Sequence, residues 1–327
     1  MNKNKMNNFL LGFSLLATSI FFQTCLAGPY PERPIKVIVG LGPGSSLDTV
    51  MRLIGQKLAE QMGQPVVVEN RSGAGGNVAA EAVARSAPDG YTLMMSYVGN
   101  QAINPTMFKS LNYDPADLIG ISKIASYPYV IISSLTVTIK SLKDLVQYAK
   151  AKPNLLSYGS SGIGSGGHLV GELFNSLEQT KMTHVPYKGS SPIMTDLLSG
   201  SLQLSFDTLN TVGPFIKSSK LNAIAVTGLT RLKEFPEIRT AKEQGFPDLT
   251  ISGWYGLFGR TGTPAAIINK LNLEIGIILS SSEMKQKLAA AGYEDETYLS
   301  AAEYAEFVQA EIKRWGALVK LTGATAD

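Results

Sequence analysis

Residues 35–62 read IKVIVGLGPGSSLDTVMRLIGQKLAEQM and combine a short apolar run, a loop and an amphipathic segment. Ile35–Val39 is rich in β-branched residues and is predicted to form a buried strand. Over Thr49–Met62 the apolar residues recur at helical spacing, which predicts a helix. Gly63-Gln64-Pro65 ends that helix, and Val66–Glu69 is the next expected strand. A strand–helix–strand unit of this length favours a parallel sheet covered by helices.

The same alternation continues and forms two sets of elements, followed by helices. The further expected strands are Tyr91–Tyr97, Val130–Ser133, Leu155–Gly159, Thr183–Pro186, Leu202–Phe206, Ala223–Val226 and Ile251–Phe258. The further expected helices are Val78–Ser86, one from Ser141 to near Lys150, Gly167–Leu177, Ser191–Leu198, Ala265–Leu279, Glu283–Ala291 and Ala301–Leu321. Two α/β sets predict two lobes with a cleft between them, and ligands of such sheets bind beyond the carboxyl ends of the strands.

The first residues have the pattern of a secretory signal peptide. Lys3 and Lys5 precede the apolar run Phe9–Phe22, and small residues lead to a cleavage site after Ala27. The run is shorter than the ~20 residues that a membrane-spanning helix needs. We therefore expect export to the periplasm with cleavage of the signal. Lipidation of Cys25 is the alternative, although the residues before it fit a lipid-acceptor site poorly.

The composition excludes several classes of partner and cofactor. The full chain has 29 basic and 26 acidic residues, so loss of the two signal lysines leaves 27 against 26, a net charge of +1. This balance gives no electrostatic footprint for nucleic acid or an anionic membrane surface. Removal of Cys25, the single cysteine, would leave no thiol for a disulfide or a metal site. Because His168 and His184 are the only histidines, a three-histidine zinc site is excluded, and we expect no metal and no cofactor.

The loop Gly42–Asp48 is the first candidate binding site. Its glycines permit close backbone approach, and its serines offer hydroxyls beside the free N–H groups of a helix N-terminus, which favour an anion. The alternative is that Ser46 or Asp48 only caps the helix. The Asp48 carboxylate is expected to hold loop amides rather than to touch an anionic ligand.

The loop Gly159–His168 is the second candidate. Nearly all of its residues are Gly, Ser or His, and glycine at this density costs backbone entropy, so a binding loop is favoured over a plain connector. A third loop, Arg71–Asn77, lacks the G-x-G-x-x-G spacing of dinucleotide-binding proteins and is interpreted as structural support.

Other polar and aromatic residues lie near the ends of expected strands. Asp207 and Thr208 either reach a cleft or start a turn. Tyr97, Asn100, Trp254 and Tyr255 also lie near expected strand ends, and core packing is the default interpretation of the aromatic ones.

The known enzyme motifs are missing. The sequence contains no G-x-S-x-G elbow, no G-x-x-x-x-G-K-[ST] loop and no H-E-x-x-H. Ser165 with His168 is the one candidate nucleophile pair, and we regard it as chance proximity on a loop. His184 lies in an apolar strand and is expected to be packed and hydrogen-bonded. We therefore expect no catalytic residues.

A series of short segments occurs in an order that is typical of one family. The segments are 30–35 (YPERPI), 68–76 (VENRSGAGG), 88–93 (PDGYTL), 103–105 (INP), 168–174 (HLVGELF), 184–189 (HVPYKG), 262–264 (GTP) and Trp315. In these the chain resembles the periplasmic solute receptors of the tripartite tricarboxylate transporter family, also called Bug receptors. The resemblance covers essentially all of the chain after the signal.

The resemblance implies a two-lobed Venus-flytrap receptor with crossing strands between its lobes. Such a receptor binds a small organic carboxylate and delivers it to a two-component integral membrane permease, without catalysis. In the family, backbone amides, hydroxyls and ordered water from two opposed loops hold the carboxylate. We expect a monomer with a signal peptide at 1–27, lobe 1 at 28–128 and 252–327, and lobe 2 at 129–251. The expected ligand-binding residues are Leu41, Pro43, Gly44, Ser45, Ser46, Asp48, Asn100, Ser160, Gly162, Ser165, His168, Asp207 and Thr208.

One segment departs from the family pattern. The first loop usually reads V-x-F-P-P-G-G-x-x-D, whereas here Leu41, Gly42 and Ser45 replace an aromatic residue, a proline and a glycine. This alters the ligand wall, so the ligand specificity does not transfer, while the capacity to bind an anion does. The alternative function is a receptor that reports its ligand to a membrane sensor kinase, and a more remote one is a periplasmic hydrolase.

Overall fold

A computed structural model describes residues 30–294 and 298–326 of the chain. By backbone contacts residues 31–327 form one compact unit, and the architecture given below is that of this unit. The predicted signal peptide, its cleavage site after Ala27 and the candidate lipid acceptor Cys25 lie outside the described residues. Within the described ranges, no helix has both the length and the apolar character that a membrane crossing requires.

The first three strands form the parallel unit that the sequence predicts. β1 (Ile35–Val39) lies between β2 (Val66–Asn70) and β3 (Thr92–Tyr97), and both pairings are parallel. α1 (Ser46–Met62) and α2 (Asn77–Ala84) pack against these strands, so the expected helix cover is confirmed here.

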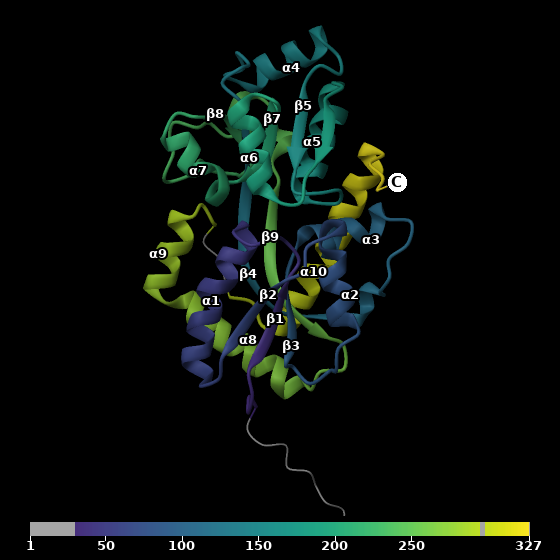
Figure 1. The fold of residues 1–327 in the computed structure, drawn as a ribbon, viewed down its shortest axis with the longest axis vertical. Helices are drawn as coiled ribbons and strands as arrows, with labels where there is room; N and C mark the ends of the chain where they lie inside the picture. Colours follow the sequence, from purple (N-terminus) through teal and green to yellow (C-terminus); the bar gives the residue numbers. More distant parts are fainter. Residues whose placement is uncertain (1–29, 295–297, 327) are drawn as a thin grey trace, which may run out of the picture. The chain divides into compact units, whose positions relative to one another are not determined.

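One long strand joins the two halves of the sheet. β4 (Leu118–Ser133) runs antiparallel to β9 (Ser252–Arg260) as far as Pro128, and from Tyr129 onward it pairs with β7 (Leu204–Thr208). β8 (Asn222–Val226) also pairs antiparallel with the end of β4. Figure 1 shows β4 and β9 running between the lower and the upper group of elements.

The prediction that this strand begins at Val130 is wrong. Polar residues such as Ser122 and Ser126 interrupt the apolar pattern before Val130, yet both are buried. Their strand is fixed by backbone pairing with β9 rather than by side-chain alternation, so the sequence pattern does not reveal it.

The second half of the sheet repeats the parallel arrangement. β5 (Ser157–Ser160) lies between β6 (Thr183–Pro186) and β7, parallel to both. The order of the described strands is β2-β1-β3-β9-β4-β7-β5-β6, with β8 beside β4. The expectation of parallel pairing is therefore correct within each three-stranded set and wrong for β4, β8 and β9. Parallel neighbours need a crossover connection between them, usually a helix, whereas antiparallel neighbours do not. β4, β8 and β9 pair in the second way.

The helices follow the predicted order with small differences at their ends. The prediction misses the short α3, the turns of other helix types and α7. Besides α1 and α2, the helices are α3 (Asn104–Met107), α4 (Leu142–Ala151), α5 (Gly166–Glu178), α6 (Ser190–Ser199), α7 (Leu209–Lys217), α8 (Ala265–Ser280), α9 (Ser282–Ala290) and α10 (Ala301–Thr322). Short 3₁₀ turns lie at Ala74–Gly76, Pro115–Asp117, Lys242–Gln244 and Pro247–Leu249, and a π-helical turn at Gly99–Ile103.

Helix α7 was not predicted because its sequence argues against a helix. It contains Gly213 and has Pro214 in its interior, and both disfavour helix locally. Leu209 and Val212 on this helix are buried in an apolar cluster with Val130 of β4. Burial of this face stabilises the helix in spite of its unfavourable residues, as is usual for amphipathic helices.

The C-terminal helix α10 packs against the crossing strand β4 and against α5, a helix of the second half. Its Trp315 is buried, and the indole N–H groups of Trp315 and of Trp254 on β9 donate to the same oxygen of Glu311, at 2.8 and 2.9 Å. The two hydrogen bonds satisfy a carboxylate that would otherwise be costly to bury.

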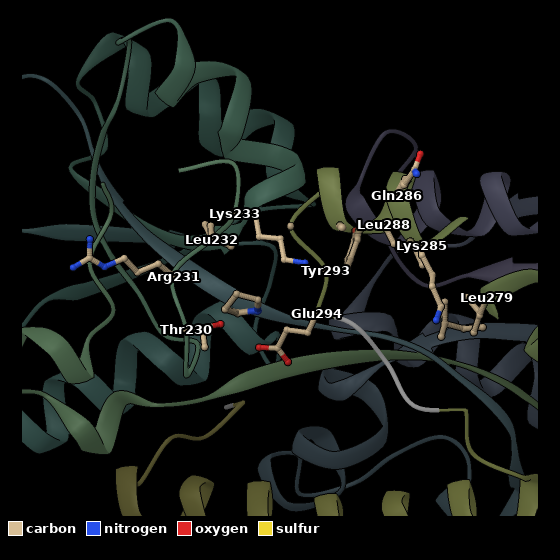
Figure 2. Close-up of a pocket in the computed structure, with 14 residues that line it drawn as sticks. Thr230, Arg231, Leu232, Lys233, Leu279, Lys285, Gln286, Leu288, Tyr293 and Glu294 are labelled. Atoms are coloured by element: carbon tan, nitrogen blue, oxygen red, sulfur yellow. The ribbon is translucent and has the colours of Figure 1, made fainter. Parts of the chain in front are cut away.

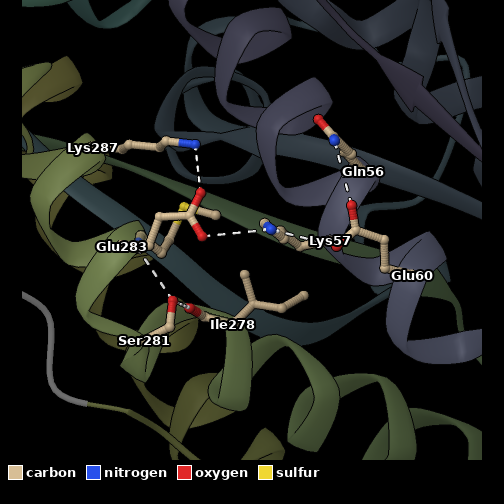
Figure 3. A network of polar contacts seen from close by, with 8 residues as sticks. Gln56, Lys57, Glu60, Ile278, Ser281, Glu283 and Lys287 are labelled. Atoms are coloured by element: carbon tan, nitrogen blue, oxygen red, sulfur yellow. Dashed lines mark hydrogen bonds and ion pairs between the residues drawn. The ribbon is translucent and has the colours of Figure 1, made fainter.

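A surface network connects α1 with α9 (Figure 3). Glu283 of α9 accepts from Lys287 at 2.7 Å and lies 3.5 Å from Lys57 of α1, which also contacts Glu60 at 3.4 Å. These side chains are largely exposed, and such pairs contribute about 0–1 kcal/mol each. The network therefore orients the helices more than it stabilises them.

Candidate functional site

The first loop is held in shape by Asp48. Ser45 is the N-cap of α1, and its Oγ accepts the Asp48 backbone N–H at 3.3 Å. The buried Asp48 carboxylate accepts hydrogen bonds from the Gly44 N–H at 3.0 Å, Asn70 Nδ2 at 2.9 Å and Arg52 Nε at 3.0 Å. Burial alone raises the pKa of Asp48, but these hydrogen bonds outweigh burial and lower it, so the carboxylate stays charged. Its charge is therefore used within the loop, as expected.

The second loop is shaped by glycine and serine. Ser165 is the N-cap of α5, and its Oγ accepts the His168 backbone N–H at 3.3 Å. Gly162 (φ 134°) and Gly164 (φ 78°) adopt backbone angles that side chains disfavour. The turn before α5 therefore depends on these two glycines.

The start of α5 lies close against the sheet because its first two residues are glycines. A Cβ at Gly166 would lie 1.7 Å from the Tyr129 Oη, and a Cβ at Gly167 would lie 2.4 Å from the Phe206 carbonyl oxygen. Any side chain would push the helix N-terminus away from β4 and β7.

Three hydroxyl groups connect the two lobes beside these loops. Ser46, the first residue of α1, has its Oγ in hydrogen-bond contact with Thr208 Oγ1 and 3.2 Å from Thr211 Oγ1. Thr208 and Thr211 are themselves 3.3 Å apart. Thr208 is the N-cap of α7. The contact therefore brings the N-terminus of a helix of one lobe against that of a helix of the other.

A small cavity of about 40 Å³ lies where the loops meet, and we call it the inner cavity. At 10–15 Å³ for each water position, this is room for about three waters. Its lining residues come from both lobes and from the crossing strands: Leu41, Ser45, Ser46, Tyr97, Tyr127, Tyr129, Ser161, Gly166, Gly167, Ser190, Phe206, Asp207, Thr208 and Tyr255.

A larger hollow of about 460 Å³, the outer hollow, adjoins the inner cavity through the shared residues Leu41 and Ser161. It is lined by Gly42, Gly162 and Lys188 among others, and Lys188 is the one cationic residue in the described lining of either space. Residues of both predicted loops line the two spaces. The outer hollow is also lined by 72–76 of the third loop, which the sequence analysis interprets as structural support.

A third space lies elsewhere, and we call it the α9 hollow (Figure 2). It also measures about 460 Å³ and lies between the segment Thr230–Lys233 after β8 and residues of α8, α9 and the following turn. Arg231, Lys233 and Lys285 line it. Arg231 forms an ion pair with Glu243 at 3.0 Å. None of the predicted ligand-binding residues lines this hollow.

Asp207 is the one acidic residue in the described lining of the inner cavity. It is buried at the end of β7, and its Oδ1 accepts the Thr208 backbone N–H at 2.7 Å. Burial raises the pKa of Asp207 to about 6, although hydrogen bonds from Ser190, Thr208 and Thr211 act in the opposite direction. Asp207 is therefore largely charged at neutral pH and titrates just below it.

Four tyrosines form the wall between the lobes. The ring centroid of Tyr127 lies 4.4 Å from that of Tyr255 and 5.5 Å from that of Tyr129, and Tyr97 completes the set. Burial holds the pKa of all four phenols above the ordinary range, so they stay neutral. The buried Tyr129 hydroxyl makes no hydrogen bond of ordinary geometry with the described residues, which leaves a polar group for a ligand or water.

The N-termini of four helices converge on the inner cavity. Ser46 begins α1, Gly166 begins α5, Ser190 begins α6 and Thr208 caps α7. Each N-terminus presents free N–H groups and the positive end of a helix dipole. None of the described lining residues of the inner cavity is Lys, Arg or His. An anion there would be held by dipoles, N–H groups and hydroxyls rather than by a countercharge.

The two histidines belong to the loop framework and bring no positive charge. Their rings stack with centroids 3.9 Å apart. His168 Nδ1 accepts the Gly164 N–H at 3.3 Å, and His184 Nε2 lies 2.7 Å from Ser160 Oγ. Burial lowers the pKa of His168 to about 4 and that of His184 to about 3, so both are neutral at pH 7. The packed, hydrogen-bonded role expected for His184 is confirmed.

The structure brings some of the predicted ligand-binding residues to the cavity and leaves others behind it. Leu41, Ser45, Ser46, Asp207 and Thr208 line the inner cavity, and Gly162 lines the outer hollow. The others lie in the loops or in the core and line neither space: Pro43, Gly44, Asp48, Asn100, Ser160, Ser165 and His168.

Asn100 is a structural residue of the π-helical turn. Its Oδ1 accepts from Ser96 Oγ at 2.9 Å and from the Tyr97 N–H at 3.2 Å, and the side chain is buried. Ser165, another predicted ligand-binding residue outside the cavity lining, is the N-cap of α5.

Sequence reasoning missed several lining residues. Tyr127 and Tyr129 lie in the part of β4 that was not predicted, and Ser190 starts a helix that was expected one residue later. Tyr97 and Tyr255 were assigned to the core by default. A useful signal was the aromatic pair on either side of Pro128, since a buried tyrosine needs a partner for its hydroxyl.

A two-lobed α/β fold with a cavity between opposed loops is typical of the periplasmic solute-binding proteins. The family model described as tripartite tricarboxylate transporter family receptor matches residues 50–324, so the chain belongs to that family and is a solute-binding receptor. The chain is 34% identical to Protein BugT of Bordetella pertussis, over 94% of this chain and 95% of that protein.

Two similar solved structures contain carboxylates. The structure of R. palustris Rpa4515 with adipate is 34% identical, with a TM-score of 0.87, and covers 91% of this chain and 99% of that one. MatC from Rhodopseudomonas palustris with bound malate is 30% identical, with a TM-score of 0.83, and covers 89% of this chain and 100% of that one. The two-lobed fold with crossing strands, which the sequence resemblance implied, is confirmed by these likenesses.

Proposed function

We propose that this chain is exported to the periplasm, captures a small organic carboxylate in the inner cavity and delivers it to a two-component membrane permease. The observation that carries the proposal is the convergence of four helix N-termini, from both lobes, on a cavity lined by hydroxyls. The adipate and malate in the two related structures support the same ligand class.

The physical basis is the set of helix N-termini and hydrogen-bond donors around the cavity. A partly buried helix N-terminus favours an anion by up to ~2 kcal/mol, and additional N–H and hydroxyl donors add to this. Micromolar affinity corresponds to about −8 kcal/mol, which several such contacts in a partly dry cleft can supply.

Binding needs the two lobes to move. The inner cavity, about 40 Å³, has room for only a few waters, so a dicarboxylate enters only if the lobes separate. We propose that lobe 1 comprises 28–128 and 252–327 and lobe 2 comprises 129–251. The change of β4 from pairing with β9 to pairing with β7, between Pro128 and Tyr129, supports this boundary.

We further propose that the signal is cut after Ala27, that the receptor acts as a monomer and that it catalyses no reaction. The bonds of His168 support the last point. Its backbone N–H donates to Ser165 and its ring Nδ1 accepts from Gly164, so both groups are engaged in shaping the loop.

The test is calorimetric titration of a panel of mono-, di- and tricarboxylates into the exported protein and into Ser46→Asp. A carboxylate at the first residue of α1 should weaken binding at least about 30-fold, because like charges then meet in the cavity. Ser282→Asp is a matched control, since Ser282 is the first residue of α9 and also follows a serine N-cap. Equal affinity of the two variants, or no carboxylate binding by folded protein, would overturn the proposal.

A further inference from the structure

The inner cavity, proposed to bind a carboxylate, has a buried carboxylate of the protein in its own lining, which is unusual for an anion site. Asp207 lines the inner cavity with only 9% of its surface exposed. Asp207 is the penultimate residue of β7, and its side chain lies at the N-termini of two helices, α6 through Ser190 and α7 through Thr208. These two helix N-termini therefore already have an anion that belongs to the protein.

The groups that face Asp207 are all neutral. They are the hydroxyls of Ser190, Thr208 and Thr211 and the phenols of Tyr129, Tyr255 and Tyr293. No described ion pair involves Asp207, and the described lining of the cavity contains no cationic side chain. A second carboxylate placed against Asp207 would meet a like charge, with no cationic side chain in the described lining to compensate it.

The N-termini of α1 and α5 remain for the ligand. Those of α1, at Ser45 and Ser46, and of α5, at Gly166 and Gly167, line the same cavity and have no acidic residue of the cavity wall against them. Asp48 lies in the first turn of α1, but its carboxylate is held by Gly44, Asn70 and Arg52 and does not line the cavity. The cavity therefore has an electropositive part at α1 and α5 and an electronegative part at Asp207. A complementary ligand has a carboxylate at one end and a hydrogen-bond donor at the other.

We propose that Asp207 determines ligand specificity: it accepts a hydrogen bond from an ammonium or hydroxyl group of the ligand, so that the receptor prefers amino- or hydroxy-substituted carboxylates to unsubstituted ones. This rests on the proposed carboxylate site. The related structures leave the question open, since malate carries a hydroxyl and adipate carries no such donor.

The experiment compares ligands that share one carbon skeleton. Succinate, malate and aspartate differ only in hydrogen, hydroxyl or ammonium at one carbon, and glutarate, 2-hydroxyglutarate and glutamate form a second trio. Calorimetric titration at pH 8, where Asp207 is charged, should show the substituted member of a trio binding about tenfold or more tightly than the unsubstituted one. The ammonium and the hydroxyl members then show which donor the site takes.

Asp207→Asn should reverse this order, since an amide can donate to a second carboxylate. The ratio of affinities should shift at least about tenfold toward succinate or glutarate. Asp196→Asn is the control, because its carboxylate accepts from Tyr187 at 2.6 Å, on α6 of the same lobe but outside the cavity, and its ratios should stay those of the wild type.

The outcomes separate this inference from the proposed function. If the unsubstituted acids bind the wild type as tightly as the substituted ones, or if Asp207→Asn leaves the ratios unchanged, the inference is wrong while the carboxylate site stands. If no carboxylate of any kind binds, the proposed function itself is wrong. The wild-type comparison alone decides the inference should the variant fail to fold.

Discussion

The inner cavity and the α9 hollow have opposite properties. The α9 hollow measures about 460 Å³ and its described lining has three cationic residues, Arg231, Lys233 and Lys285, against one acidic residue, Glu294. The inner cavity measures about 40 Å³, and its described lining has no cationic residue and one acidic residue, Asp207. By size and charge the α9 hollow is the better anion site. The inner cavity alone has helix N-termini from both lobes in its wall. The comparison teaches that oriented dipoles and N–H groups, not net charge, identify the candidate carboxylate site.

The largest expected effect comes from the contact that allows α5 to reach the cavity. Gly167→Ala places a Cβ 2.4 Å from the Phe206 carbonyl oxygen, a backbone atom of β7 that has little freedom to move. We expect about a 100-fold loss of carboxylate affinity in calorimetric titration, and a loss of about 1–3 kcal/mol in the free energy of unfolding.

The matched control for this change lies in the first loop. At Gly42 a Cβ would lie 3.7 Å from the Lys188 carbonyl oxygen, an ordinary contact. Gly42→Ala should stay within about ±0.5 kcal/mol of wild-type stability. If both glycine variants bind carboxylates like the wild type, the helix N-terminus of α5 has no part in binding, and the comparison of the two spaces fails.

The two binding loops could be predicted from the sequence more fully than the other residues that line the inner cavity. Both glycine- and serine-rich loops could be found because strand, turn and helix N-terminus follow each other locally, as in 39–48 and 159–168. Ser46 and Thr208 were found as separate candidates, but their contact joins residues far apart in the chain, which no local pattern reveals.

The parts of the fold that the sequence did not predict are fixed by tertiary contacts. The first part of β4, with Tyr127 and Tyr129, is fixed by pairing with β9, and α7 forms around Pro214 because its apolar face is buried. Propensity and periodicity carry no information about either, since packing overrides both there. Tyr127 and Tyr129 were therefore not predicted at all. Tyr97 and Tyr255 were assigned to the core by default, although both line the cavity.

The carboxylate of Asp207 in the inner cavity should make the stability of the protein depend on pH. Burial raises the pKa of Asp207 to about 6 in the folded protein, from an ordinary value of 3.8. The folded protein then binds the proton more tightly than the unfolded chain, so stability falls as the pH rises from about 4 to 6 and the loss is complete above that window.

The loss should amount to roughly 1–3 kcal/mol. Urea unfolding between pH 4 and 8 measures it as the difference between the wild type and Asp207→Asn, which lacks the titrating group. The phenols around Asp207 stay neutral over this range because burial raises their pKa. A difference that does not change with pH would show that Asp207 is not an electronegative part of the cavity wall.

A smaller effect is expected where the lobes touch. Ser46→Ala removes the hydroxyl that contacts Thr208 and Thr211 across the lobes. We expect about a three- to tenfold loss of carboxylate affinity, equivalent to one ordinary hydrogen bond. Calorimetry measures the affinity, and small-angle scattering with saturating ligand measures whether the lobes still close. An affinity equal to that of the wild type would exclude Ser46 from the binding contacts.

The smallest effect is expected in the α9 hollow, where positive charge is most abundant. Lys233→Ala with Lys285→Ala removes two of its three cationic side chains, while Arg231 remains paired with Glu243. Carboxylate affinity at the inner cavity should stay within about twofold of the wild type, because exposed charges are screened beyond about 8 Å at physiological salt. A loss comparable to that of Gly167→Ala would place the carboxylate in the α9 hollow, and net charge would then identify the binding site after all.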